Sequence, residues 1–193
     1  MKKVLILLMC LSFSPSFAQQ NDYFYNIPEA PESFSSANIL SRMVDALGFR
    51  YYWATSGLEN KDLEFKPNPE SRTTLETLQH ICGLTDITKN TAIGQSTNFS
   101  TRVIPTDFKS VRAKTLQDLK DASIYLKSKP LSPEQEKMIF ESDNGGSEYP
   151  LWNLINGPLA DALWHTGQVV SFRRSSGNPL PSGINVLTGI KKD

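Results

Sequence analysis

The side chains best suited to chemistry lie in the segment 152–179. Asp161, His165 and Gln168 are spaced i, i+4 and i+7, so on a helix they form one stripe. A carboxylate and an imidazole one turn apart can both point at a single metal ion. The same two groups can also form a simple hydrogen bond or a surface ion pair. The residues of this segment alone leave these alternatives open.

The same segment predicts one continuous helix with clear ends. Asn156 is a suitable N-cap, and Pro158 then falls in the first turn, where its missing N–H costs nothing. The run Gly-Asn-Pro at 177–179 ends the pattern. Because the apolar residues form a broad face, we expect this helix to be buried on most sides. These apolar residues are Leu159, Ala162, Leu163, Val169 and Val170.

Three other segments show helical periodicity. The first predicted helix begins at one of three serines, Ser33, Ser35 or Ser36, and ends near Gly57. The second is capped by Thr73 or Thr74 and contains His80. The third covers 111–128. Four helical segments joined by loops predict an all-α fold, a four-helix bundle with one long loop and an extended C-terminal tail. The segment 130–150 is the least clear: Ser132 and Pro133 could open a short helix, and 137–140 could continue that helix or form a strand, before a turn at 143–147.

Several residues are expected to serve packing. Cys82 falls in an apolar helical pattern, which favours a buried and inert thiol. The aromatic group at 51–53 is interpreted as core, with the wall of a pocket as the alternative. Gly167 lies inside a helical pattern, where glycine costs about 1 kcal/mol relative to alanine. We therefore expect another helix or side chain to approach Gly167 closely.

Residues 1–18 have the pattern of a signal peptide. Lys2 and Lys3 precede a short apolar run, and a small-x-small cleavage site ends at Ala18. The run is too short to span a membrane. We predict export to the periplasm or the medium, with 19–193 as one domain and no membrane association after cleavage. The zero formal net charge of the sequence does not favour nucleic-acid binding.

Three segments of the sequence show a family pattern: 73–81 (TTLETLQHI), the loop 63–67 (LEFKP) that precedes it, and 165–168 (HTGQ). Together they resemble the DinB-like (YfiT-like) superfamily of metal-dependent four-helix-bundle proteins. The resemblance covers roughly 39–179. It implies a divalent metal bound by one histidine of the second helix and two histidines of the fourth. His80 and His165 match, whereas the remaining position is Asp161. This departure leaves metal identity open among Zn, which is favoured, and Ni, Mn or Fe.

The resemblance also implies a class of function. An exported metal-dependent hydrolase or group transferase acting on an unknown small molecule is the first hypothesis, with Gln168 orienting water or supporting a ligand. The second is a bundle that binds a metal or a small ligand without catalysis. The third is a structural bundle in which Asp161 and His165 pair with each other. Whether the chain forms a homodimer is left open.

Overall fold

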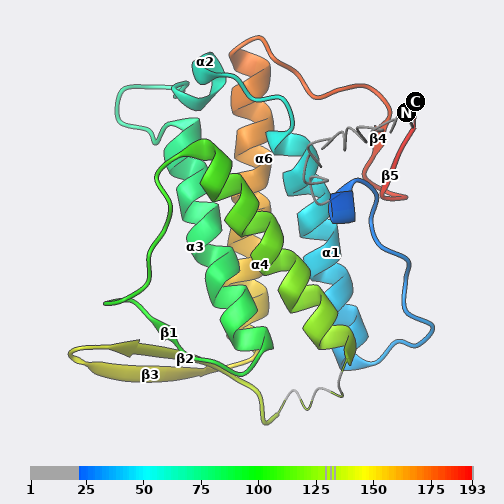
Figure 1. Cartoon of the computed structure of the whole chain (residues 1–193), viewed down its shortest axis with the longest axis vertical. Helices are drawn as coiled ribbons and strands as arrows, with labels where there is room; N and C mark the ends of the chain where they lie inside the picture. Colours follow the sequence, from blue (N-terminus) through cyan, green and yellow to red (C-terminus); the bar gives the residue numbers. More distant parts are fainter. Residues whose placement is uncertain (1–21, 129, 131, 133, 193) are drawn as a thin grey trace, which may run out of the picture.

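The computed structural model describes residues 22–128, 130, 132 and 134–192. The protein is helix-rich, with small sheets. Its four long helices are α1 (Ser36–Thr55), α3 (Thr74–Ala92), α4 (Phe108–Ser128) and α6 (Ala160–Ser175). Helices α3 and α1 each pack against both α4 and α6, so the four surround a common core. A short helix, α2 (Asn60–Leu63), lies at one end of the long helices, and a sheet lies at the other (Figure 1).

Two of the predicted helix starts are confirmed. Ser35 caps α1, because its hydroxyl accepts a hydrogen bond from the Asn38 N–H at 3.2 Å. Thr73 caps α3 and forms a reciprocal capping box with Glu76. The Thr73 hydroxyl accepts from the Glu76 N–H at 3.1 Å, and the Glu76 carboxylate accepts from the Thr73 N–H at 2.7 Å. The carboxylate of Glu76 is therefore engaged in starting the helix that carries His80.

The predicted start of the last helix is wrong. The helix begins with α5 (Trp152–Leu154) and passes through a π-helical turn, η2 (Ile155–Leu159), directly into α6. Asn156 is therefore inside the helix and is no N-cap, and Pro158 lies in the π-turn instead of a first turn. The longer i→i+5 turn accommodates a proline that an ordinary α-helix would exclude.

The expected burial of this helix on most sides is also wrong. Leu163 is 46% exposed and Trp164 is 72% exposed. The residues of α6 that face the core are Ala162, Thr166, Val169 and Arg173. One face of α6 is thus open to solvent, and the polar stripe lies beside the buried face.

The structure contains strands, so the all-α prediction is wrong in that respect. β1 (Thr97–Asn98) pairs in parallel with β2 (Lys137–Ser142), which forms an antiparallel hairpin with β3 (Gly145–Pro150). Met138 is the buried residue of β2, and Gly145 has a φ of +116° at the turn, which suits glycine. Of the two alternatives for 137–140, the strand is therefore observed, within β2.

The C-terminal tail folds back instead of lying extended. β4 (Ile184–Asn185) and β5 (Ile190–Lys191) form a small antiparallel pair. The Ile27 N–H donates to the Gly189 carbonyl at 2.7 Å, so the tail is attached to the segment that precedes α1. This segment begins with a short 3₁₀ helix, η1 (Asp22–Phe24).

One hydrophobic core lies between the long helices. Tyr51 and Trp53 are buried in agreement with the core interpretation, and Cys82 is buried with a pKa raised by burial, as expected for an inert thiol. Phe24 of η1 is also a core residue, 1% exposed. We expected another helix or side chain to approach Gly167 closely. This prediction is wrong, because Gly167 is exposed and an added Cβ would meet nothing within 4 Å.

Arg173 fixes the end of α6 against α1. Its side chain is 1% exposed, and its Nη1 donates to the Trp53 and Ala54 carbonyls, each at 3.0 Å. These carbonyls belong to the last turn of α1, where a cation also interacts favourably with the helix dipole. The contact holds α6 in place and, with it, the polar stripe.

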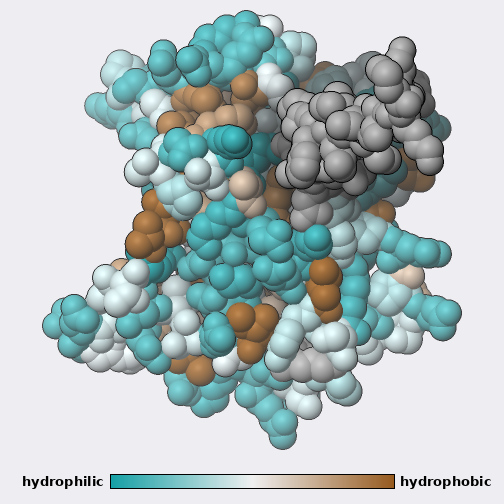
Figure 2. Space-filling model, in the orientation of Figure 1, coloured by the Kyte–Doolittle hydropathy of each residue, from teal (hydrophilic) through white to brown (hydrophobic). Residues whose placement is uncertain are grey.

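The face of the molecule that α4 crosses is largely hydrophilic, with small separate hydrophobic patches (Figure 2). Within the described residues, no helix combines the length and the hydrophobicity needed to cross a membrane. The predicted signal peptide, 1–18, lies outside the described residues.

Candidate metal centre

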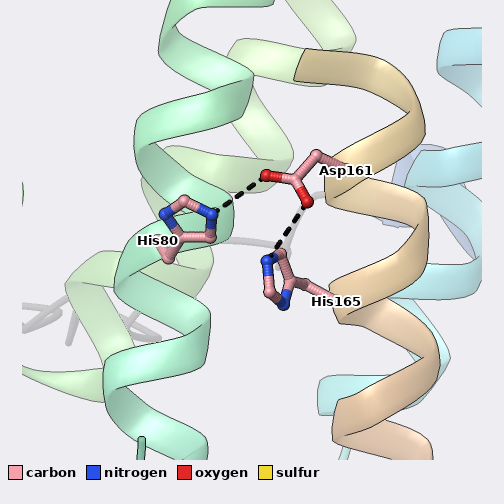
Figure 3. A group of neighbouring side chains, drawn as sticks. All are labelled: His80, Asp161 and His165. Carbon is pink, nitrogen blue, oxygen red and sulfur yellow. Dashed lines mark hydrogen bonds and ion pairs between the residues drawn. The ribbon is translucent and has the colours of Figure 1, made fainter. Parts of the chain in front are cut away.

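Three side chains from two neighbouring helices converge. His80 extends from α3, while Asp161 and His165 extend from successive turns of α6, and all three point into the space between the helices (Figure 3). The His80 Nε2 lies 3.1 Å from Oδ2 of Asp161, and the His165 Nε2 lies 3.3 Å from Oδ1. The centres of the two imidazole rings are 4.6 Å apart. The shared site that the resemblance implied requires the second and fourth long helices to be neighbours, and the structure brings His80 and His165 together there.

The helices position this cluster at the edge of the core. Thr77 and Ile81 of α3 and Ala162 and Thr166 of α6 are buried. A side chain one residue away from a buried position on a helix lies about 100° around the axis, beside the core and not in it. The side chains of His80, Asp161 and His165 are accordingly 32%, 37% and 17% exposed. The cluster is therefore accessible to an ion and to a small molecule.

Gln168 orients His165. The Nδ1 of His165 lies 2.6 Å from Oε1 of Gln168. Because an amide oxygen only accepts, Nδ1 carries the proton, and the neutral ring then presents the lone pair of Nε2 to Asp161. A lone pair and a carboxylate oxygen repel each other at 3.3 Å unless a cation or a proton lies between them. This hydrogen bond is the kind of outer contact that orients metal-ligating histidines.

The electrostatics around His80 favour its neutral form. Burial lowers the pKa of His80, and the hydrogen bond with Asp161 raises it. The positive charge of Arg72 lowers it further, and the net pKa is below the usual value of a histidine. A histidine must be neutral to coordinate a metal. His80 therefore meets that requirement at neutral pH.

The donor set fits a divalent metal. A tetrahedral centre with bonds of about 2.0–2.1 Å separates its ligand atoms by about 3.3 Å. The nitrogen–oxygen distances of 3.1 Å to Oδ2 and 3.3 Å to Oδ1 of Asp161 are close to that separation, and one ligand atom from each of the three residues lies within 4.8 Å of the others. Two imidazoles and one carboxylate are normal ligands for Zn and also suit Ni, Mn or Fe. The group could thus hold a metal ion.

Sequence reasoning missed Arg72 as a neighbour of the cluster. It is exposed and lies two residues before the first residue of α3, outside any periodic pattern. Its position just ahead of the helix that carries His80 was the one feature of the sequence that could have indicated this proximity. Trp164, next to His165 in the chain, is also exposed.

No protein-family model, no curated protein and no solved structure matches the chain. The resemblance to the DinB-like superfamily stays a prediction based on 63–67, 73–81 and 165–168.

Proposed function

We propose that the chain is an exported metal-dependent hydrolase or group transferase of the DinB-like type, whose four long helices form a bundle around a divalent metal. His80, Asp161 and His165 are the proposed ligands, and Zn is the first choice of metal. The observation that carries the proposal is the convergence of these three partly exposed side chains at ligand-like distances. The proposed substrate is a small molecule, which could reach the three side chains because each of them is partly exposed.

The bound ion and the residues around it would have separate roles in the proposed reaction. A bound divalent ion supplies Lewis acidity, which polarises a carbonyl or phosphoryl group and lowers the pKa of water. Asp161 contributes one negative charge, which only partly offsets a divalent ion. Gln168 holds the proton of His165 on Nδ1, so that Nε2 faces the ion. Three protein ligands leave one position for water or substrate.

A non-catalytic protein that binds a metal or a small ligand is the second candidate. Glu76 is the acidic residue that α3 carries one turn before His80, and it would be a natural general base. Its carboxylate is instead bound to the Thr73 N–H at 2.7 Å, in the capping box. This engagement favours binding without turnover.

Metal content is the first test. Protein produced without an affinity tag is analysed by mass spectrometry for bound metals, and affinity is measured by competition with a chelator. We expect about one equivalent of a divalent metal in the wild type. His80→Ala and His165→Ala should lose it, whereas Asp143→Asn, a change at an exposed turn position, should retain it. Equal metal content in all four proteins would refute the site.

Activity and export need separate tests. Hydrolysis of esters and amides and transfer to thiols are screened with metal-loaded protein, and activity that requires His165 would favour an enzyme over the binding protein. Sequencing the N-terminus of the exported form tests cleavage after Ala18. An exported form that still begins at Met1 would contradict the signal-peptide proposal.

A further inference from the structure

A hydrophobic groove runs along α1 where this helix faces α5 and η2. It consists of three adjoining hollows, and Met43 lines all three. The first hollow has a volume of about 190 Å³, and Ile39, Trp152 and Ile155 are among its walls. The second, of about 450 Å³, lies between α1 and the segment that precedes it, and the third, of about 390 Å³, lies farther along α1 toward its C-terminal end. Ligand sites in proteins usually have about 300–1,000 Å³, so the groove is large enough for a small molecule with a long apolar part.

The walls of this groove are apolar side chains left exposed by the fold. Phe34 is 92% exposed and Trp152 is 72% exposed, and Ile39, Met43 and Leu163 are exposed as well. These five side chains come from the segment before α1, from α1, from α5 and from α6, yet they line one continuous groove. A contiguous exposed apolar surface of this kind indicates a binding site.

Two arginines of α1 border the groove, Arg42 in the second hollow and Arg50 in the third. Arg42 donates to the Pro28 carbonyl at 2.6 Å, and Arg50 donates to the Ala46 and Val186 carbonyls at 3.0 and 3.3 Å. Carbonyl groups carry no formal charge. Among the described residues, no carboxylate lies within ion-pair distance of either guanidinium, and no acidic residue lines the three hollows. Within the part of the chain that the structure describes, neither guanidinium therefore has an acidic partner.

We propose that this groove binds a single-chain amphiphile with an anionic head group, such as a long-chain carboxylate. The alkyl chain would lie over Met43, with the carboxylate at a guanidinium, which binds carboxylates through paired hydrogen bonds. A second copy of this chain fits less well. A symmetric contact uses the same surface on both subunits, so it would place Arg42 and Arg50 of each copy in an interface whose described lining contains no acidic residue.

The groove is independent of the candidate metal centre. Leu163 of α6 lines the groove, whereas Asp161 and His165 point toward α3. Successive helical residues are about 100° apart, so Leu163 lies well over a quarter of a turn from both. Failure of metal binding would therefore leave this proposal intact, and the converse also holds.

The test is a binding series with the wild-type protein. Saturated carboxylates of eight to fourteen carbons, each below its micelle concentration, are titrated while tryptophan fluorescence and heat are recorded. Each added methylene should tighten binding about fourfold until the groove is filled. Alkyl alcohols and alkyltrimethylammonium ions of equal chain length should bind about tenfold more weakly or worse. The proposal would be overturned if the affinity did not depend on chain length, or if alkyltrimethylammonium ions bound as tightly as carboxylates of equal chain length.

Matched variants locate the site. Met43→Asp should abolish binding, whereas Val103→Asp, at an exposed apolar position outside the groove, should not change it. Arg42→Gln combined with Arg50→Gln should remove the preference for carboxylate over alcohol and keep the dependence on chain length. Circular dichroism verifies folding, and the wild-type series stands even if a variant fails to fold. Unchanged affinity in Met43→Asp, or self-association of the wild type that Met43→Asp abolishes, would refute the amphiphile and indicate another site or a second copy.

Discussion

Gly48 and Gly167 both lie inside long helices, yet alanine should have opposite effects at the two positions. At Gly48, a Cβ would lie 2.3 Å from Cε1 of Phe24 and 2.5 Å from Cδ1, far inside the optimal carbon–carbon distance of about 3.5–4.0 Å. The ring of Phe24 is 1% exposed and must shift within a packed core. At Gly167, a Cβ meets nothing within 4 Å. The sign of each change follows from this difference in space.

The magnitudes can be estimated from the same contacts. Overpacking a core costs about 1–3 kcal/mol, and losing a buried phenylalanine altogether costs about 3–5 kcal/mol. Alanine regains about 1 kcal/mol of helix propensity at either position. Gly48→Ala should thus lower the free energy of unfolding by up to about 4 kcal/mol, and Gly167→Ala should raise it by about 1 kcal/mol.

Urea unfolding followed by far-UV circular dichroism measures both changes, in chelator to remove any metal. Combining Gly48→Ala with Phe24→Ala supplies the control, because the alanine should no longer destabilise once the ring is absent. Equal effects of the two glycine substitutions, or a Gly48→Ala penalty that persists without the ring, would refute this account of the packing.

Three further predictions concern the candidate metal centre. Gln168→Ala should weaken metal binding about 10- to 100-fold in chelator competition, because the His165 Nδ1–H loses its acceptor; unchanged affinity would exclude an orienting role. Asp161→Ala should remove much of the affinity and Asp161→His should retain or tighten it, and equal losses would contradict the ligand assignment. The pKa of His80 is lowered on folding, so the unfolded chain binds the proton more readily. The metal-free protein should therefore lose stability as pH falls below about 6.5, and His80→Gln should lessen that loss in urea midpoints measured from pH 7 to 5; an unchanged pH profile would refute it.

Local signals explain why the helices and the candidate ligands were predictable. Serine and threonine are favoured at helix N-caps, and in the structure Ser35 caps α1 and Thr73 caps α3. The i, i+4 spacing of Asp161 and His165 places both on one side of any helix that contains them. With only two histidines in the chain, a shared site required the helices that carry His80 and His165 to be neighbours. Periodicity and capping predicted the helices, whereas the assignment of His80 to the same site as Asp161 and His165 also rested on the resemblance to the DinB-like superfamily.

Contacts between distant segments explain what was missed. Phe24 lies in a polar N-terminal segment, and nothing near it in the sequence indicates that its ring packs on Gly48 of α1. The cost of a helical glycine is the same at Gly48 and Gly167, so sequence alone could not tell which one faces a neighbour. The hairpin of β2 and β3 has one buried residue, Met138, and hence only a weak alternating pattern.

The π-turn η2 determines where the candidate ligands point. Leu154 is buried, 1% exposed, just before the turn. In an uninterrupted α-helix, residues seven and eleven positions later share the face of Leu154, and these are Asp161 and His165. Both would then point into the apolar core, where unpaired polar groups cost several kcal/mol, roughly. The Ala160 N–H instead bonds back to the Ile155 carbonyl, which adds one residue to the turn. That residue turns the following helix by about 100°, so that Ala162 and Thr166 face the core and the two ligands face His80.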